Sequence, residues 1–289
     1  MRVLVNGVRL FFDVEGPGLV PDGPAMRGKP TIVLLHGGPG FDHSIYKPVL
    51  SSLADIAQVV FLDHRGNGRS DPGPQSSWTL AQWGDDVHAF CEALGIERPI
   101  VLGMSFGGMV ALAYATRHPA HPAKLILGNT EAAGGSYLER RVALFERFGG
   151  PEIGALARRR FLDGHTDAAT LEAWVRMAFP LYSRTPRDPD AIRRTVRHPE
   201  VGHWFTQPSG EGYTFNFFPV LQRIQCPTLV LGGEEDPMTP IECQADLAAA
   251  LPQHLARFER FPGSGHTVLV DAPERAVALI RDFILRPTA

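Results

Sequence analysis

The sequence predicts an α/β fold with a mostly parallel central sheet, helices on both faces of the sheet and an inserted helical cap. Short apolar runs alternate with helical stretches between residues 31 and 127, and the alternation returns between residues 228 and 285. The segment between these parts has no run apolar enough for a central strand. Strands joined by helical crossovers are parallel and wind right-handed, which gives this fold class.

The chain therefore divides into three parts. Residues 1–130 form the first part of the core, residues 131–219 form the cap, and residues 220–289 complete the core. The cap is predicted to be helical because arginine-rich stretches in it are separated by Gly, Pro and Asp. These helix-like stretches cover residues 137–148, 152–162, 168–180 and 189–197.

The first elements precede the parallel part of the sheet. Arg2–Val5 and Val8–Val14 are predicted to form a hairpin, because Asn6-Gly7 between them favours a tight turn. Residues 15–30 hold four glycines and four prolines and are predicted to be a loop. The elements that follow are a strand at Thr31–Leu35, a short helix at Ile45–Leu53, a strand at Val59–Leu62 and an amphipathic helix at Leu80–Leu94.

The later elements keep the same alternation of strand and helix. Ile100–Leu102 is a buried strand that leads through a tight turn into a helix at Gly108–Arg117, and Lys124–Leu127 is the next strand. After the cap, the predicted order is strand Thr228–Leu231, helix Pro240–Leu251, strand Ala256–Phe261 and helix Pro273–Leu285.

Composition and charge exclude several functional classes. The formal net charge of −3 gives no electrostatic reason for binding nucleic acid or an anionic membrane. The three cysteines, Cys91, Cys226 and Cys243, are too irregularly spaced for a disulfide framework or a zinc site, and we expect buried free thiols. No apolar run approaches ~18 residues and no signal peptide is visible, so we expect a cytoplasmic protein without a membrane span. We expect no cofactor and no metal.

The turn at Gly103-Met104-Ser105-Phe106-Gly107 carries the strongest functional signal. It has the glycine-x-serine-x-glycine pattern between a predicted strand and a predicted helix. In this context the pattern indicates a turn that carries a nucleophilic serine. A serine on so tight a turn has a strained backbone, and its side chain stands clear of the sheet. Gly103 and Gly107 avoid collisions with the neighbouring elements. We therefore predict that Ser105 is a nucleophile.

Functional sites in open α/β sheets lie at the carboxyl ends of the strands, so the residues directly after each strand are the candidates for catalysis. Ser105 follows one strand, Asp236 lies in the loop Gly232–Pro237 after the next-to-last strand, and His266 ends the loop Pro262–His266 after the last strand. A serine hydroxyl is a poor nucleophile at neutral pH and needs a base. We expect His266 to accept the proton of Ser105, and Asp236 to hold the histidine in the required tautomer.

Such chemistry also needs two N–H groups that stabilise the negatively charged oxygen of the transition state. The first is the backbone N–H of Phe106, directly after the serine, and the second is that of Gly38 in the loop His36–Gly40. His36 is expected to hold this loop by hydrogen bonds. Glu131 is an alternative for the acid, because it follows the strand after the serine-bearing helix.

Five motifs in order, HGGPG, DHRGNGRS, GMSFGG, GGEEDPMTP and GSGH, resemble the α/β-hydrolase superfamily along nearly the whole predicted core. HGGPG together with the helical cap resembles the proline iminopeptidase group of serine peptidases. The resemblance implies that Ser105, Asp236 and His266 are the catalytic triad, and that Gly38 and Phe106 are the oxyanion donors.

The sequence departs from that peptidase group in three places. Its serine turn lacks the usual glycine before the serine and tryptophan after it, and His64 stands where glutamine is typical. The group binds the free amino terminus of its substrate with acidic residues of the cap, and the nearest segment here is Glu200–Phe205. Glu200 is therefore the candidate amine anchor, and Glu131 and Trp204 are further candidates for substrate contact.

The sequence therefore predicts a metal-free serine hydrolase that cleaves a small amide or ester through an acyl-enzyme. The leading substrate is an aminoacyl amide or a short peptide with an N-terminal proline, since a cap over the site favours small substrates. An esterase or lactonase of specialised metabolism is one alternative, and a non-catalytic ligand-binding protein on the same fold is another. The oligomeric state stays open.

Overall fold

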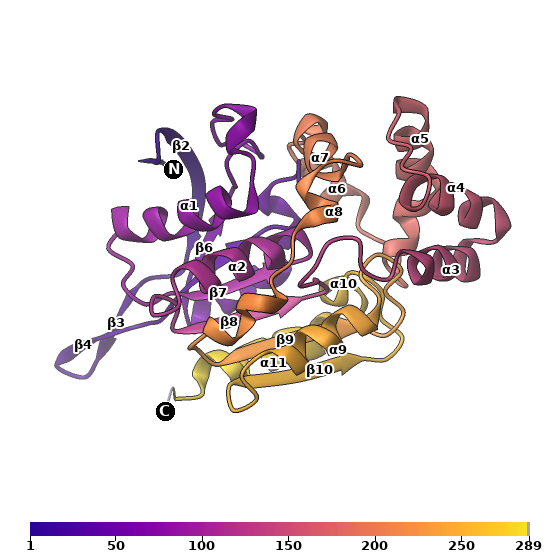
Figure 1. Ribbon diagram of the computed structural model, residues 1–289. Helices are drawn as coiled ribbons and strands as arrows, with labels where there is room; N and C mark the ends of the chain where they lie inside the picture. Colours follow the sequence, from indigo (N-terminus) through magenta and orange to yellow (C-terminus); the bar gives the residue numbers. More distant parts are fainter. Residues whose placement is uncertain (288–289) are drawn as a thin grey trace.

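The computed structural model describes residues 1–287 and contains an eight-stranded sheet in the order β1-β2-β6-β5-β7-β8-β9-β10 (Figure 1). The strands β1, β2 and β6 pair antiparallel, and every neighbouring pair from β6 to β10 is parallel. The predicted α/β fold with a mostly parallel sheet is thereby confirmed. The strands are β1 (Arg2–Val5), β2 (Val8–Glu15), β5 (Thr31–Leu35), β6 (Gln58–Leu62), β7 (Ile100–Met104), β8 (Lys124–Gly128), β9 (Thr228–Gly233) and β10 (Ala256–Phe261).

Helices cover both faces of the sheet because successive strand residues point to opposite faces. In β5, Val33 and Leu35 belong to the apolar cluster on one face, and Ile32 and Leu34 belong to the cluster on the other. The first face packs against α1 (Leu80–Ala93), α2 (Phe106–Arg117) and α9 (Ile241–Ala250), and the second against the 3₁₀ segment η2 (Val49–Asp55), α10 (Val268–Asp271) and α11 (Pro273–Leu285).

Between β8 and β9 the chain leaves the sheet and forms the helical insertion that the sequence predicts (Figure 1). Its first half has a small apolar core of its own, centred on Phe145, Phe161 and Trp174. Its second half packs on the main core through Val201 and Phe205. The insertion contains α3 (Leu138–Gly149), α4 (Pro151–Phe161), α5 (Ala168–Ala173), the π-helical turn η4 (Trp174–Ala178), the 3₁₀ turn η5 (Phe179–Tyr182), α6 (Pro189–Arg194), α7 (Pro199–Thr206) and α8 (Glu211–Thr214).

Two segments differ from the sequence prediction. Residues 15–30 are not only a loop, because they contain an antiparallel hairpin of β3 (Leu19–Asp22) and β4 (Ala25–Gly28). Almost all of its side chains are exposed, so no apolar alternation marks these strands in the sequence. The expected helix at Ile45–Leu53 is instead a pair of 3₁₀ segments, η1 (His43–Tyr46) and η2, separated by Lys47 and Pro48.

Some short elements were not predicted. The helices α7, α8 and α10 have eight residues or fewer, and so show little helical periodicity in the sequence. The 3₁₀ turns η3 (Gln75–Ser77) and η6 (Phe218–Arg223) are shorter still or interrupted by proline. All three cysteines are buried free thiols, as the sequence predicts. None of the helices in residues 1–287 combines the length and the hydropathy that a bilayer span needs.

Two glycines let α2 lie directly against strand backbone: Gly107 of α2 faces the end of β5, and Gly103 of β7 faces the first turn of α2. A Cβ added to Gly107 would lie 1.9 Å from the carbonyl oxygen of Leu35, and a Cβ added to Gly103 would lie 2.1 Å from the carbonyl oxygen of Gly107. The obstructing atoms belong to the backbone, so no side-chain rotation relieves the clash. These two positions therefore require glycine.

We expect Gly107→Ala to lower the free energy of unfolding by about 3 kcal/mol or more, because α2 or β5 must shift to admit the methyl group. Urea unfolding followed by circular dichroism measures this change. Gly28→Ala is the matched control, because an added Cβ there meets no atom within 4 Å. It should change the stability by less than about 0.5 kcal/mol. Equal stability of the two variants would contradict the close approach.

Candidate active site

Ser105 occupies the turn between β7 and α2 in a strained conformation, with φ 54° and ψ −123°. The neighbouring strand β8 holds this turn from its carboxyl end. The N–H of Ser105 donates to the carbonyl of Gly128 over 2.8 Å, and its own carbonyl accepts from the hydroxyl of Thr130 over 2.8 Å. The serine side chain is therefore presented at the carboxyl edge of the sheet, where the sequence places it.

His266 lies in the loop after β10, and its Nε2 is 2.9 Å from Oγ of Ser105. The insertion holds this loop in place. The N–H of His266 donates to the carbonyl of Tyr182 over 2.7 Å, and the Tyr182 ring packs edge to face on the imidazole with centroids 5.3 Å apart. The fold thus brings a serine and a histidine that are distant in sequence within hydrogen-bond distance.

Asp236 lies in the loop after β9 and is completely buried. Its Oδ2 is 2.9 Å and its Oδ1 is 3.1 Å from Nδ1 of His266. The backbone N–H groups of Met238 and Thr239 donate to Oδ1, and the Thr239 hydroxyl and the Asn129 amide donate to Oδ2. Ser105, His266 and Asp236 therefore form one hydrogen-bonded chain, which we call the Ser–His–Asp group.

The hydrogen bonds around Asp236 decide its charge. Burial by itself raises the pKa of Asp236, but the facing charge and hydrogen bond of His266, together with the bonds from Thr239, outweigh burial and lower this pKa below 3.8. Asp236 is therefore ionised at neutral pH and accepts a hydrogen bond from the N–H group at Nδ1 of His266. That tautomer leaves the lone pair of Nε2 directed at Ser105.

The glycine loop, residues 36–40, follows β5 and adjoins the serine turn. A Cβ added to Gly37 would lie 3.4 Å from the Cβ of Ser105, and Gly38 has a φ of +56°, which favours glycine. His36 holds this loop: its Nδ1 lies 3.1 Å from the Gly37 carbonyl, and its Nε2 accepts from the N–H of His64 over 3.3 Å. Burial lowers the pKa of His36, so the ring is neutral and serves as both donor and acceptor.

Phe106 is the first residue of α2, so its backbone N–H belongs to the first turn, whose N–H groups have no partner inside the helix. The ring is buried and packs edge to face against His64, Trp83 and Phe205. These contacts keep the first turn of α2 beside Ser105. The two backbone segments that were predicted to supply oxyanion donors therefore both adjoin the serine.

Glu131 is buried close to the Ser–His–Asp group but has a different partner. It forms an ion pair with Arg141 of α3, and both side chains are almost fully buried. Burial raises the pKa of Glu131, while the charge of Arg141 opposes that rise. The Nδ1 of His266 contacts Asp236, so Glu131 does not take the place of the acid in this arrangement.

Glu200 and Trp204 both lie on α7. The side chain of Glu200 is 54% exposed and pairs with Nδ1 of His198 over 3.1 Å. The start of α7 packs on the glycine loop, because a Cβ added to Gly40 would lie 2.4 Å from the carbonyl oxygen of His198. Trp204 packs edge to face against Trp78 of the main core. Glu200 thus lies on a helix whose start packs on the glycine loop, and its carboxylate is bonded to His198 and not to the Ser–His–Asp group. Trp204 packs against the main core.

Three supporting residues were missed by sequence reasoning. Asn129, with φ 45°, donates to Asp236 and to the carbonyl of Gly265, and so joins two loops of the site. Its position two residues after the end of the predicted strand Lys124–Leu127 is a signal that could have found it. Thr239 follows Asp236 in the same turn. Tyr182 has no such signal, because only the folding of the insertion brings it to the histidine.

The family follows from this fold and site. A family model described as the alpha/beta hydrolase fold matches residues 30–273. The chain therefore belongs to the α/β hydrolase fold family. The carboxyl-edge serine turn and the two loops that carry Asp236 and His266 all lie within the matched residues.

Relatives with several activities resemble this chain at low identity. The protein named "Putative carbamate hydrolase RutD" from Caulobacter sp. (strain K31) is 29% identical over 281 residues, which cover 95% of each chain. The proline iminopeptidase of Lactobacillus helveticus (strain DPC 4571) is 28% identical over 271 residues, which cover 89% of this chain and 90% of that protein. The crystal structure of proline iminopeptidase from Mycobacterium smegmatis has a TM-score of 0.80 and 25% identity, and the match covers 98% of this chain and 97% of that one.

We expect the stability effect of Asp236→Asn to depend on pH. Because the native pKa of Asp236 is lowered from 3.8, its charge stabilises the native state above the unfolded pKa, and this contribution is lost as the pH falls through the native pKa. The difference in free energy of unfolding between wild type and variant should be largest near neutral pH, and should narrow below about pH 4. Urea unfolding at several pH values measures it.

Asp22→Asn is the control for that experiment, because its side chain is 65% exposed on the β3–β4 hairpin. Its effect should be small at every pH. A pH-independent difference for Asp236→Asn would mean that the buried carboxylate has no lowered pKa.

Proposed function

We propose that the chain is a serine hydrolase that cleaves a small amide or ester through an acyl-enzyme, with Ser105, His266 and Asp236 as its catalytic triad. The observation that carries the proposal is the pair of 2.9 Å contacts, from Ser105 Oγ to His266 Nε2 and from His266 Nδ1 to Asp236 Oδ2. A nucleophile, a base and an orienting acid connected in this way are what acyl transfer requires.

The first half of the reaction forms the acyl-enzyme. Ser105 Oγ attacks the carbonyl carbon of the substrate while its proton passes to Nε2 of His266. The carbonyl oxygen becomes an oxyanion, which accepts hydrogen bonds from the N–H groups of Gly38 and Phe106. When the intermediate collapses, the bond to the leaving group breaks, and the imidazolium gives its proton to the departing nitrogen or oxygen. An ester on Ser105 remains.

The second half releases the product. His266 takes a proton from a water molecule as this water attacks the ester carbonyl, and then returns the proton to Ser105 Oγ when the acid leaves. Asp236 stays ionised throughout and stabilises the imidazolium in both halves. The lowered pKa of Asp236 and its complete burial support this role.

The leading substrate in this proposal is an aminoacyl amide or a short peptide with an N-terminal proline. The low-identity similarity to proline iminopeptidases supports it. The insertion contacts His266 through Tyr182, which favours small substrates over folded proteins. Glu200 is the proposed partner of the substrate amine, since α7 packs on the glycine loop beside Ser105.

A specific observation favours an esterase or lactonase as the second candidate. Glu200 is exposed and already paired with His198, and an ester or lactone substrate has no amine that would compete for this carboxylate. The triad chemistry is the same for both candidates, because the leaving group is either an alcohol or an amine. Substrate preference therefore separates them.

We expect Ser105→Ala to lower kcat by about 10⁴- to 10⁶-fold, because no other group supplies the nucleophile. A fluorophosphonate probe should label the wild type and not the variant, and circular dichroism should show the same fold for both. Ser52→Ala, an exposed serine on η2, is the control and should keep full activity and labelling. Absence of labelling in the wild type would support a non-catalytic ligand-binding protein instead.

We expect aminoacyl arylamides with a free amine to be hydrolysed with a higher kcat/KM than N-acetylated arylamides, aryl esters and lactones. Glu200→Gln should raise KM for free-amine substrates by about tenfold, because a charge-assisted hydrogen bond is lost. Glu152→Gln is the matched control, since Glu152 follows a proline in the first turn of α4 as Glu200 does in α7. If the wild type and both variants hydrolyse esters or lactones with a higher kcat/KM than free-amine arylamides, the result favours the esterase or lactonase.

A further inference from the structure

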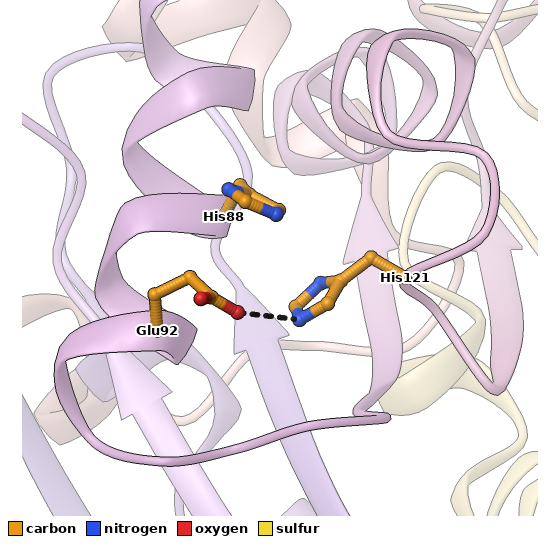
Figure 2. A group of neighbouring side chains, drawn as sticks. All are labelled: His88, Glu92 and His121. Carbon is orange, nitrogen blue, oxygen red and sulfur yellow. Dashed lines mark ion pairs between the residues drawn. The ribbon is translucent and has the colours of Figure 1, made fainter.

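A second group of side chains with metal-binding chemistry lies where α1 faces the loop after α2. Figure 2 shows His88 and Glu92 on one helix and His121 reaching toward them from the loop. One ligand atom of each side chain lies within 4.8 Å of those of the other two. His88 and Glu92 are four residues apart and so share one face of α1. We call these three residues the His88–Glu92–His121 cluster.

One nitrogen in the cluster lacks a partner. Nε2 of His121 is buried and has no hydrogen-bond partner in the described part of the chain. Its nearest acid is Glu92, whose Oε1 is 3.7 Å away, which is too long for a hydrogen bond (Figure 2). The other ring nitrogen, Nδ1, bonds to the hydroxyl of Tyr114. Because a hydroxyl can accept, Nδ1 can carry the proton and leave the Nε2 lone pair free for a metal.

The second imidazole is also held in position. The ring of His88 stacks on that of His118 with centroids 4.0 Å apart, and Nε2 of His118 bonds to Asp85 over 2.8 Å. Burial and the neighbouring His118 lower the pKa of His88, and burial and His88 lower the pKa of His121. Both rings are therefore neutral at neutral pH, which is the form that binds metals.

We propose that the His88–Glu92–His121 cluster binds one divalent transition-metal ion of the zinc type, with water completing the coordination. Two imidazoles and one carboxylate suit Zn²⁺ by ligand type and number. Tetrahedral ligands about 2.1 Å from zinc lie about 3.4 Å from one another. The ligand atoms lie within 4.8 Å of one another, so each distance between two of them has to shorten by about 1.4 Å at most. Rotation of Glu92, whose side chain is 62% exposed, and of the partly exposed His88 can supply this movement.

A second group, Asp42, His43 and Asp63, has similar spacing but is already saturated. Asp63 accepts hydrogen bonds from the N–H groups of His43 and Arg69, and it also contacts Nδ1 of His43. Asp42 pairs with the guanidinium of Arg69, which supplies the positive charge that a metal would bring. We therefore propose no metal at this group.

The proposed ion lies far from the acyl-transfer chemistry. Ser105 precedes the first residue of α2, whereas His121 follows its last turn, and a helix of 12 residues is about 18 Å long. The ion would instead connect α1 to the loop before β8. Because it binds the folded chain, it should raise the unfolding temperature without being needed for hydrolysis.

The test is isothermal titration of the tag-free, EDTA-treated full-length protein with ZnCl₂. We expect one Zn²⁺ per chain and a rise in Tm in the presence of ZnCl₂. His88→Ala and His121→Ala should each weaken the affinity by about tenfold or more and abolish the Tm rise. His254→Ala, an exposed histidine outside the cluster, is the control and should bind Zn²⁺ as the wild type does.

Absence of saturable one-to-one binding in the wild type would overturn the proposal, as would equal affinity in the wild type and both histidine variants. If His121→Ala does not fold, His88→Ala and Glu92→Gln decide the outcome, because Glu92 is exposed and His88 is only partly buried. Weaker binding in these two variants supports the cluster, and unchanged binding places the ion elsewhere.

Discussion

The close contact between backbone segments around the serine turn determines where α2, Ser105 and the glycine loop lie relative to one another. At Gly107 the helix α2 meets the end of β5 with no room for a methyl group, and at Gly103 the strand β7 meets the first turn of α2. This contact fixes where α2 begins, and Ser105 takes its strained φ as a consequence. The same approach sets the glycine loop after β5 against the serine. One packing constraint therefore positions both the side chain and the backbone groups that adjoin it.

The buried charge of Asp236 is the second condition on the site. A carboxylate without solvent is costly unless donors surround it. Here the donors come from separate segments: Asn129 after β8, Thr239 in the same turn, and His266 after β10. The helical insertion adds a fourth segment, because Tyr182 holds the histidine loop by its carbonyl and its ring. The loops of the site are thus tied to one another rather than placed independently by their strands.

The two ends of α2 differ in chemistry. Its first turn adjoins Ser105 and the glycine loop, whereas the loop after its last turn carries His121 toward α1. The core between them is apolar, and the residues of α2 from Phe106 to Thr116 are all buried. A ligand on the histidine cluster would therefore act on the stability of the α1–α2 pair and not on the serine directly.

The alternation of apolar runs was enough to predict the parallel strands, because the strands from β5 to β9 are buried on both faces and bounded by turn residues, and β10 lies between turn residues as well. It was not enough for the β3–β4 hairpin, whose exposed side chains carry no pattern. By itself the sequence determined the fold class, the helical insertion and the position of Ser105 on its turn, since these depend on local periodicity and glycine spacing. The packing of the folded chain was needed to show which acid contacts His266, which side chains pair with Glu131 and Glu200, and which neighbours Tyr182 and His121 contact. The contact of His266 with Asp236 and that of Tyr182 with the histidine loop join segments far apart in the chain, and a local pattern contains no information about such distances. The partners of Glu131 and Glu200 are nearer in the chain, but which side chains meet depends on how the insertion folds.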